Sequence, residues 1–253
     1  MTDYRPVLSY GGGVNSTALA ILAVNEGWRG PIVFSDTGTE WPDTTCFMDM
    51  FERDWLAPRG LRIERIGAEW RHKGWHEHLI EYCERARVVP MGMRRWCTIE
   101  YKIKPLEAWC AARGLSNDSD VMIGIAADES GRMMSACRPL VDRYIDRKGC
   151  VRIIQSEGLS VPRKSGCYIC PFQRDSQWRE LWTRHPDLFT RAERMEENAR
   201  RRRTNRRGGN PLVLDIAGKV TLAQRRFTYE NQIEIAEIDM DKLLEYRPCT
   251  CSL

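Results

Sequence analysis

Short apolar runs alternate with helical stretches through the first half of the chain. Three apolar runs predict buried strands, at residues 7–9, 31–36 and 121–125, and alternating apolar and polar residues predict a further strand at 61–66. Helical spacing of apolar residues falls between them, at residues 18–26, 42–55, 76–86 and 105–113. This alternation predicts right-handed parallel β-α-β units with ligand sites at the carboxyl ends of the strands. We therefore predict an α/β fold with a doubly wound parallel sheet.

The second half of the chain has a different pattern. Residues 177–199 predict one or two amphipathic helices, broken at His185–Pro186, and a short apolar run at 211–216 is compatible with one more strand. Paired cysteines and a dense run of arginines also lie in this half. We predict two domains, residues 1–145 with the parallel sheet and residues 146–253 as a cysteine-rich, mainly helical region with a basic segment.

A glycine-rich loop joins the first strand to the first helix. Three residues without a Cβ let backbone N–H groups surround a phosphate, and the helix adds its positive end. No lysine follows as in a Walker loop, and Ser16 stands where a dinucleotide fingerprint has its third glycine. The PP-loop pattern Ser-Gly-Gly-x-Asp-Ser fits, with Gly11 and Asn15 as departures, whereas a glycine turn without a ligand is the plain alternative. The candidate phosphate-binding residues are Ser9, Gly11, Gly12, Gly13, Asn15, Ser16 and Thr17.

Composition narrows the class of protein. The 253 residues suffice for one sizeable α/β domain with an extension, and the net charge of +4 says little about partners. No apolar stretch has the length of a membrane span or a signal-peptide core, so we expect a cytoplasmic protein. Ten cysteines in such a protein favour metal ligands or catalytic thiols over disulfides.

Three further blocks follow the glycine loop in order. They are Val33–Glu40 with Asp-Thr-Gly, Arg94–Leu106 with Cys-x-x-x-x-Lys-x-x-Pro-Leu, and Gly124–Arg132 with Asp-Glu-Ser-x-x-Arg. Together with the loop they resemble the phosphoadenosine phosphosulfate (PAPS) reductase family, over about residues 5 to 175. That family also contains PP-loop ATP pyrophosphatases of the adenine nucleotide alpha hydrolase-like type, which adenylate a substrate. Some of them insert sulfur into nucleic acids.

The resemblance implies ATP and Mg²⁺ as cofactors. It adds Asp36, Thr37, Gly124 and Asp128 to the nucleotide-binding residues of the glycine loop. The catalytic candidates are Asn15, Ser16, Asp36, Lys102, Glu129 and Arg132. From the residues alone, Asp128 and Glu129 follow a predicted strand, where they can hold Mg²⁺ beside a triphosphate or merely cap a helix. The four cations near Cys97 suit phosphate or sulfate, or else form a solvated basic turn.

The Cys-x-x-Cys turn at Cys167 and Cys170 presents two thiolates to one metal, and Pro171 after it is similar to iron–sulfur loops. Cys97 and Cys150 are the candidates that complete four ligands, with Cys137 as a spare. Sulfonucleotide reductases of the resembled family hold a [4Fe-4S] cluster with a Cys-Cys pair and a later Cys-x-x-Cys, but Trp96 replaces the first cysteine of the pair here. Zinc, a redox dithiol and plain buried thiols remain alternatives. The helical patterns around Cys46, Cys83 and Cys110 predict small packing residues.

An arginine-rich segment and the C-terminal cysteines are further candidates for functional roles. Six arginines in eight positions fit a nucleic-acid backbone or a solvated linker, and they are Arg200, Arg201, Arg202, Arg203, Arg206 and Arg207. The tail carries Cys249 and Cys251 without the Glu-Cys-Gly-x-His motif of the family's reductases. These cysteines belong to a frayed terminus or to a sulfur relay.

The resemblance leads to one principal hypothesis. An ATP pyrophosphatase would adenylate a substrate oxygen in nucleic acid, as in DNA phosphorothioation or tRNA thiolation. Sulfur held or passed by the cluster would then replace that oxygen. A cysteine desulfurase is a candidate sulfur donor. Asn15 in place of aspartate is a poorer Mg²⁺ ligand, which weakens this hypothesis. The alternatives are a PAPS or APS reductase acting through a tail cysteine and a nucleic-acid-binding module without catalysis.

Overall fold

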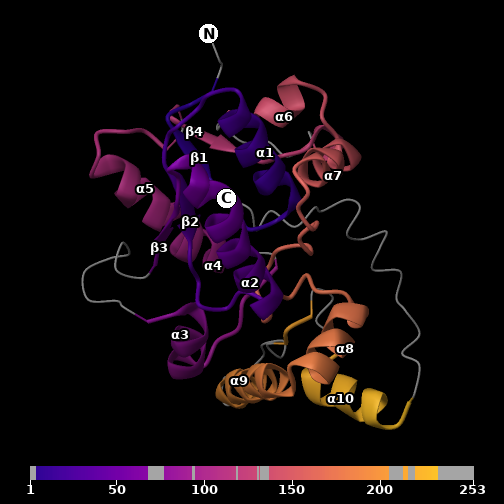
Figure 1. Cartoon of the computed structure of the whole chain (residues 1–253). Helices are drawn as coiled ribbons and strands as arrows, with labels where there is room; N and C mark the ends of the chain where they lie inside the picture. Colours follow the sequence, from indigo (N-terminus) through magenta and orange to yellow (C-terminus); the bar gives the residue numbers. More distant parts are fainter. Residues whose placement is uncertain are drawn as a thin grey trace. The chain divides into compact units, whose positions relative to one another are not determined.

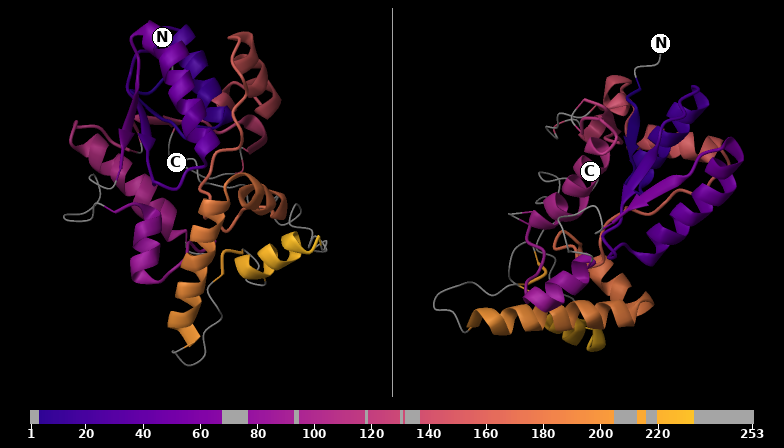
Figure 2. Two further views of the ribbon diagram at one scale, coloured as in Figure 1. Left: turned by 60° about the horizontal axis from the view of Figure 1, so that its bottom comes forward. Right: turned by 90° about the vertical axis from the view of Figure 1, so that its left-hand side faces the viewer.

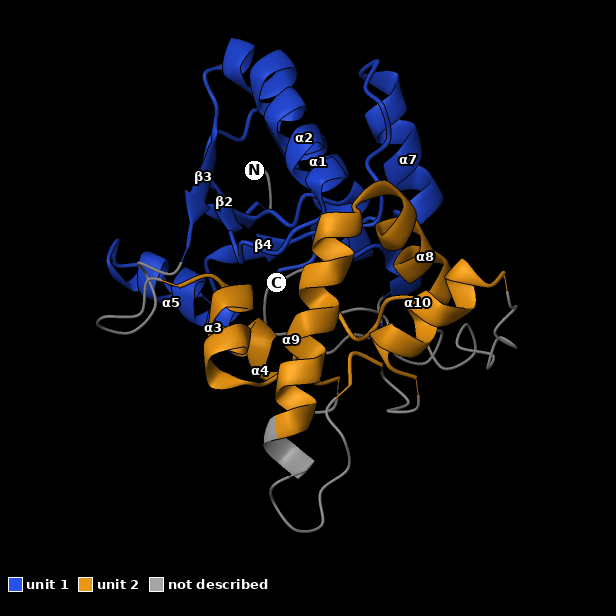
Figure 3. Ribbon diagram, turned by 90° about the horizontal axis from the view of Figure 1, so that it is seen from below, with its two compact units in different colours: residues 1–76, 100–166, 250–253 blue, residues 77–99, 167–249 orange. Residues whose placement is uncertain are grey.

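The computed structural model describes most of the chain as two compact units. The described residues are 4–67, 77–92, 95–117, 119–129, 131, 137–204, 213–215 and 220–232. One unit comprises residues 1–76, 100–166 and 250–253, and the other comprises residues 77–99 and 167–249 (Figure 3). Each unit is assembled from separate stretches of chain, whereas the sequence predicts a single boundary after residue 145.

The first unit is built on a four-stranded parallel sheet with the strand order β3-β2-β1-β4. The strands are β1 (Val7–Ser9), β2 (Ile32–Ser35), β3 (Ile63–Ile66) and β4 (Val121–Ile123). All four lie within the predicted runs. Ser9 of β1 pairs with Val33 of β2 and Ile123 of β4, so the carboxyl ends of these strands meet at one edge. This is the edge that the sequence assigns to a ligand.

Helices cover both faces of this sheet (Figure 1). Their bounds are α1 (Val14–Asn25), α2 (Pro42–Phe51), α5 (Lys104–Ala111), α6 (Pro139–Asp142) and α7 (Arg147–Ser156). One apolar core joins Leu8, Ile32 and Met122 to α1, α2 and α7. A second core packs Val7 and Val33 against α5. Alternate residues of β1 thus face opposite cores, and the predicted doubly wound α/β fold is confirmed.

Short non-α turns continue two of these helices. A π-helical turn, Glu52–Leu56, and a 3₁₀ turn, Ala57–Arg59, extend α2 to Gly60, whose φ is +73°. A second π-helical turn, Ile99–Ile103, leads into α5 and contains the buried Lys102. Another 3₁₀ turn, Ala127–Glu129, follows β4. Such turns are frequent near functional sites, and two of these carry predicted site residues.

The second unit is helical in its described part. Its helices are α3 (Leu79–Ala86), α4 (Trp96–Thr98), α8 (Asp175–Arg184), α9 (Pro186–Thr204) and α10 (Leu222–Glu230). The predicted break at His185–Pro186 separates α8 from α9, while α8, α10 and α3 all pack on α9 (Figure 2). The described residues of the possible strand at 211–216, Val213 to Asp215, form a bend and not a strand.

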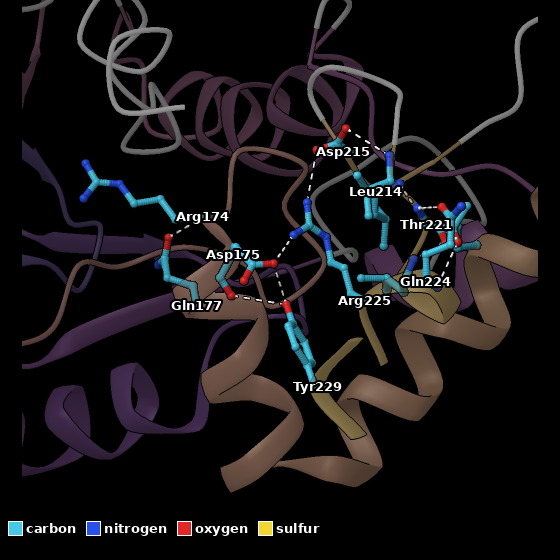
Figure 4. A network of polar contacts seen from close by, with 12 residues as sticks. Arg174, Asp175, Gln177, Leu214, Asp215, Thr221, Gln224, Arg225 and Tyr229 are labelled. Carbon is cyan, nitrogen blue, oxygen red and sulfur yellow. Dashed lines mark hydrogen bonds and ion pairs between the residues drawn. The ribbon is translucent and has the colours of Figure 1, made fainter. Parts of the chain in front are cut away.

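A buried arginine ties α8, α10 and the 213–215 bend together (Figure 4). Arg225 is 5% exposed, and its guanidinium pairs with Asp175 and, at 3.3 Å, with Asp215. The Tyr229 hydroxyl also donates to Asp175 Oδ1, at 2.7 Å. Two carboxylates thus neutralise one buried guanidinium. Without them, the buried charge of Arg225 would be unpaired and would destabilise the fold.

Glu196 on α9 fastens the same bend through its carboxylate. Its two oxygens accept the backbone N–H groups of Leu214 at 2.6 Å and Leu222 at 2.7 Å. Burial raises the pKa of Glu196 from its ordinary 4.5 to about 7, against the lowering effect of both N–H donors. The folded state therefore keeps a proton that the unfolded chain releases near pH 4.5.

We expect this carboxyl to make stability fall with rising pH. Its contribution is complete below pH 4.5 and is lost as pH rises through about 7. We expect the free energy of unfolding of wild type, measured by chemical denaturation, to fall between pH 5 and pH 8 by about 2 kcal/mol more than that of the E196Q variant. Equal pH dependence in the two proteins would contradict this assignment.

Candidate nucleotide site

The glycine loop after β1 leaves no room for side chains at two positions. Gly12 has a φ of +68°, and a Cβ there would lie 2.8 Å from Met48 Sδ. A Cβ on Gly13 would lie 2.6 Å from the Ser165 hydroxyl. Gly13 is also the N-cap of α1, without a side-chain cap. Bare backbone therefore borders the positive end of α1, which is the geometry of an anion site.

Hydroxyl groups hold this loop in shape. Ser16 Oγ donates to the Gly13 carbonyl and accepts from the Gly11 N–H, both at 3.2 Å. Thr17 Oγ1 lies 3.0 Å from the Tyr10 hydroxyl, whose pKa is raised by burial. The predicted hydroxyl donors thus have partners inside the protein, and Ser16 and Thr17 shape the loop in this structure.

Gly124 lets the segment after β4 reach the start of α1. A Cβ on Gly124 would lie 2.6 Å from the backbone N and Cα of Ser16 and 2.7 Å from the carbonyl carbon of Asn15. Because these contacting atoms belong to the backbone, no flexible side chain can move to make room for a Cβ. Gly124 is a predicted nucleotide-binding residue, and its role in this structure is to permit this close approach.

A polar group gathers beside the loop. Asn15 Nδ2 lies 3.4 Å from Glu129 Oε2, and Arg147 Nη1 lies 3.5 Å from Asn15 Oδ1. The backbone N–H of Arg147 donates to Asp128 Oδ1 at 3.1 Å. Asp146 accepts from the Gly149 N–H at 2.7 Å and so starts α7 at Arg147. Two carboxylates, an amide and a guanidinium therefore surround the first turn of α1.

The end of β2 supplies a second polar group. Asp36 Oδ1 accepts the Gly38 N–H at 2.7 Å, and Thr37 Oγ1 donates to Glu40 Oε1 at 2.8 Å. Burial raises the pKa of Glu40. The charge of Lys102 lowers this pKa, and the charge of Asp36 raises it. Lys102 is only 8% exposed, and its carbonyl accepts the Ser35 hydroxyl at 3.2 Å. These contacts bring Asp36, Glu40 and Lys102 to one part of the sheet edge.

The structure thus gathers most predicted nucleotide-site residues at the carboxyl edge of the sheet. Arg132 lies outside the described residues. Three further residues contribute without having been singled out in the sequence, namely Glu40, Arg147 and Ser165. Only Arg147 had a local signal, since an aspartate precedes it as a helix cap. Ser165 approaches through a tertiary contact, whereas Glu40 accepts a hydrogen bond from Thr37, only three residues away.

The four predicted metal ligands are divided between the two units. Cys150 lies on α7 within the apolar core of the first unit, where burial raises its pKa to about 12. Cys97, Cys167 and Cys170 belong to the second unit. Cys137, the spare candidate, pairs with β4 through a bridge to Met122. Within the described ranges, no three histidine, cysteine or acidic side chains are arranged around a single metal ion.

The predicted packing cysteines have different surroundings. Cys83 and Cys110 are completely buried, as expected, whereas Cys46 on α2 is exposed, so the packing expectation is wrong for Cys46. Burial raises the pKa of Cys83, and the Cys97 and Cys167 thiols raise it further. Cys249 and Cys251 lie outside the described residues.

The arginine run begins on the last turns of α9. Arg200 and Arg201 both pair with Glu197, at 3.4 Å and 3.0 Å, and the Arg201 side chain is 75% exposed. The side chains of Arg202 and Arg203, and all of Arg206 and Arg207, lie outside the described residues. No helix in the described part of the chain has both the length and the apolar character needed to cross a membrane.

A protein-family model matches the N-terminal part of the chain. Residues 5–93 match the model of the phosphoadenosine phosphosulfate reductase domain. The matched range contains the glycine loop, β2 with Asp36, and Glu40. No curated protein matches the chain. Residues 5–93 therefore belong to a phosphoadenosine phosphosulfate reductase domain, a member of the PP-loop, adenine nucleotide alpha hydrolase-like superfamily.

Proposed function

We propose that this protein is a PP-loop ATP pyrophosphatase that adenylates its substrate for sulfur insertion. The observation that carries the proposal is the bare Gly12–Gly13 backbone at the start of α1, bordered by the Asn15, Glu129 and Arg147 side chains. Members of the PP-loop family bind ATP with Mg²⁺. A family domain of this kind supports an ATP pyrophosphatase-like or sulfonucleotide-related enzyme.

The residues divide the work by charge. The loop N–H groups would bind the β- and γ-phosphates, and the Arg147 guanidinium would offset the charge that develops on leaving pyrophosphate. Asp128 and Glu129 would hold Mg²⁺, which commonly takes one or two carboxylates and completes its shell with phosphates and water. A preformed three-ligand group is therefore not needed. The carbonyl of Lys102 accepts the Ser35 hydroxyl at the end of β2, so its ammonium group would be available near this edge for the α-phosphate.

The reaction itself is a substitution at phosphorus. A substrate oxygen attacks the α-phosphorus of ATP, the bond to the bridging oxygen breaks, and pyrophosphate leaves with that oxygen. The product is an adenylated substrate whose oxygen has become a leaving group for sulfur. A [4Fe-4S] cluster held by the cysteines would supply a sulfur-binding, electron-transferring centre.

Nucleic acid is the substrate class that we propose. Arginine grips phosphate through two parallel hydrogen bonds, and the exposed Arg201 at the end of α9 begins a run of such side chains. A cysteine desulfurase would be the sulfur donor. Sulfonucleotide reduction is the second candidate, since the matched domain is named for it.

Pyrophosphate release tests the proposal. Purified protein with ATP and Mg²⁺ should release one pyrophosphate for each adenylate transferred to tRNA or DNA, and it should release pyrophosphate faster with the nucleic acid than without it. A protein that releases none with either nucleic acid, and instead forms sulfite from a sulfonucleotide, is a reductase.

The tail cysteines separate the two candidates. We expect the C249S/C251S variant to keep wild-type pyrophosphate release, because adenylation requires no thiol. A reductase that acts through a tail cysteine must lose sulfite formation in the same variant. Pyrophosphate and sulfite are therefore measured in parallel for wild type and the variant, so that loss of one product can be compared with retention of the other.

A further inference from the structure

A segment far along the chain lies against the glycine loop. It comprises residues 163–166, which belong to the first unit. A Cβ added to Gly13 would lie 2.6 Å from the Ser165 hydroxyl and 3.6 Å from the backbone nitrogen of Ser165. Gly13 is the N-cap of α1, so this segment lies beside the positive end of that helix. The proposed phosphate-binding loop therefore has a neighbour from a distant part of the sequence.

Contacts with the start of α2 fix this segment in place. The Arg163 guanidinium lies over the buried Trp41 ring, 3.8 Å from its centroid, and pairs with Asp43 at 3.0 Å. The Arg163 side chain is only 18% exposed. The Gly166 carbonyl accepts the Trp41 N–H at 3.3 Å. A planar guanidinium that stacks on a ring and pairs with a carboxylate has a defined position, so the segment is anchored on both sides of Ser165.

The Ser165 hydroxyl stands close to the place of a capping side chain. The N-cap residue of a helix is often serine, threonine or aspartate, whose side-chain oxygen accepts an N–H group of the first turn. Gly13 has no side chain and forms no such cap. Ser165 Oγ lies in the space that a side chain on residue 13 would enter, since it is 2.6 Å from the Cβ position. An oxygen in this space lies beside the first turn of α1 and beside an anion bound there.

A hydroxyl group suits both states of such a site. It has one O–H donor and two acceptor lone pairs, and its hydrogen rotates to suit the partner. In the free protein it can accept an N–H group of α1, and with phosphate bound it can donate to a phosphate oxygen. This exchange adds a donor for phosphate without adding a charge to the loop.

We propose that Ser165 is a phosphate-binding residue whose hydroxyl donates to the β- or γ-phosphate of ATP, and that Arg163 positions it. The inference rests on the proposed function, which assigns these phosphates to the loop N–H groups. The hydroxyls of Ser16 and Thr17 already form hydrogen bonds within the loop and its strand. Ser165 adds a hydroxyl donor from outside the loop.

Direct binding of phosphate compounds tests the role of Ser165. Full-length wild type, S165A and S160A are titrated calorimetrically with ATP, inorganic pyrophosphate and AMP, each with Mg²⁺. Ser160 is an exposed residue of the same connection after α7, so S160A removes an identical hydroxyl from the surface. Because a hydrogen bond to a charged group is lost, we expect S165A to bind ATP and pyrophosphate about tenfold more weakly than wild type. AMP has neither a β- nor a γ-phosphate, so its affinity should not change, and S160A should match wild type with all three compounds.

A double-mutant cycle tests the positioning role of Arg163. The R163A variant loses both the stack on Trp41 and the pair with Asp43, so we expect it to weaken pyrophosphate binding. Because Arg163 acts through Ser165, the R163A/S165A variant should bind pyrophosphate no more weakly than S165A alone. Additive losses in folded proteins, as judged by circular dichroism, would show that Arg163 does not act through Ser165.

The outcomes separate this inference from the proposed function. Equal pyrophosphate affinity of folded S165A and wild type overturns the role of Ser165, while pyrophosphate release from ATP would still support the ATP pyrophosphatase. An equal loss of AMP affinity in S165A also overturns the role, because it indicates a general disturbance of the site. A selective loss of ATP and pyrophosphate affinity supports the role even in a protein that releases no pyrophosphate, and in that case only the proposed function is wrong.

Discussion

The G124A variant is expected to lose nearly all pyrophosphate release. The added methyl group would lie 2.6 Å from the backbone of Ser16, and no flexible side chain is there to move aside. The segment after β4 must therefore shift away from α1, taking Asp128 and Glu129 with it. Displacements of about 1 Å in an active site can cost about a hundredfold in rate, so we expect a loss of at least that size in kcat/KM.

Stability should fall in the same variant. Forcing a methyl group into a filled space costs about 1–3 kcal/mol, which urea denaturation can resolve. G131A is the matched control, because a Cβ on Gly131 meets no atom of the described residues within 4 Å. Wild-type kcat/KM in folded G124A would show that the contact between the β4 segment and α1 is not needed for catalysis.

The R147A variant is expected to bind ATP poorly. Arg147 Nη1 lies 3.5 Å from Asn15 Oδ1 at the start of α1, where it can reach a bound phosphate. Hydrogen bonds to charged groups contribute about 1.5–3 kcal/mol, so KM for ATP should rise about 10- to 100-fold. Lysine keeps the positive charge but not the planar guanidinium group, so KM for ATP in R147K should lie between those of wild type and R147A.

A neighbouring arginine on the same helix gives the control. Arg152 is an exposed residue of α7, and R152A removes the same charge without touching the glycine loop. Steady-state kinetics over a range of ATP concentrations should show a raised KM only for R147A and R147K. Equal KM values for R147A and R152A would remove Arg147 from the nucleotide site.

Much of the first unit follows from local rules. The runs around Val7, Ile32 and Val121 are apolar and short, as buried parallel strands require on both faces, whereas the edge strand around Ile63 alternates apolar and charged residues. Glycine can adopt a φ of +68°, so Gly12 marks the loop before any contact is known. Pro42 fits the first turn of α2, since its missing N–H has no partner there.

The second unit was less accessible to such reasoning. It combines residues 77–99 with residues 167–249, and a local pattern carries no information about which distant segments pack together. Within this unit, the contact between the Tyr82 and Trp96 rings and the ion pair of Glu84 with Arg191 join residues that lie far apart in the sequence.

The sequence by itself determined the parallel α/β sheet and the glycine loop at the carboxyl edge of that sheet. These depend on backbone preferences and on the period of apolar residues, which act over a few neighbouring positions. The tertiary structure decided that Arg147 lies beside Asn15, that Gly124 lies against Ser16, and that Cys150 lies in an apolar core. Close packing fixes such contacts between residues far apart in the chain, and it depends on the shapes of both partners at once.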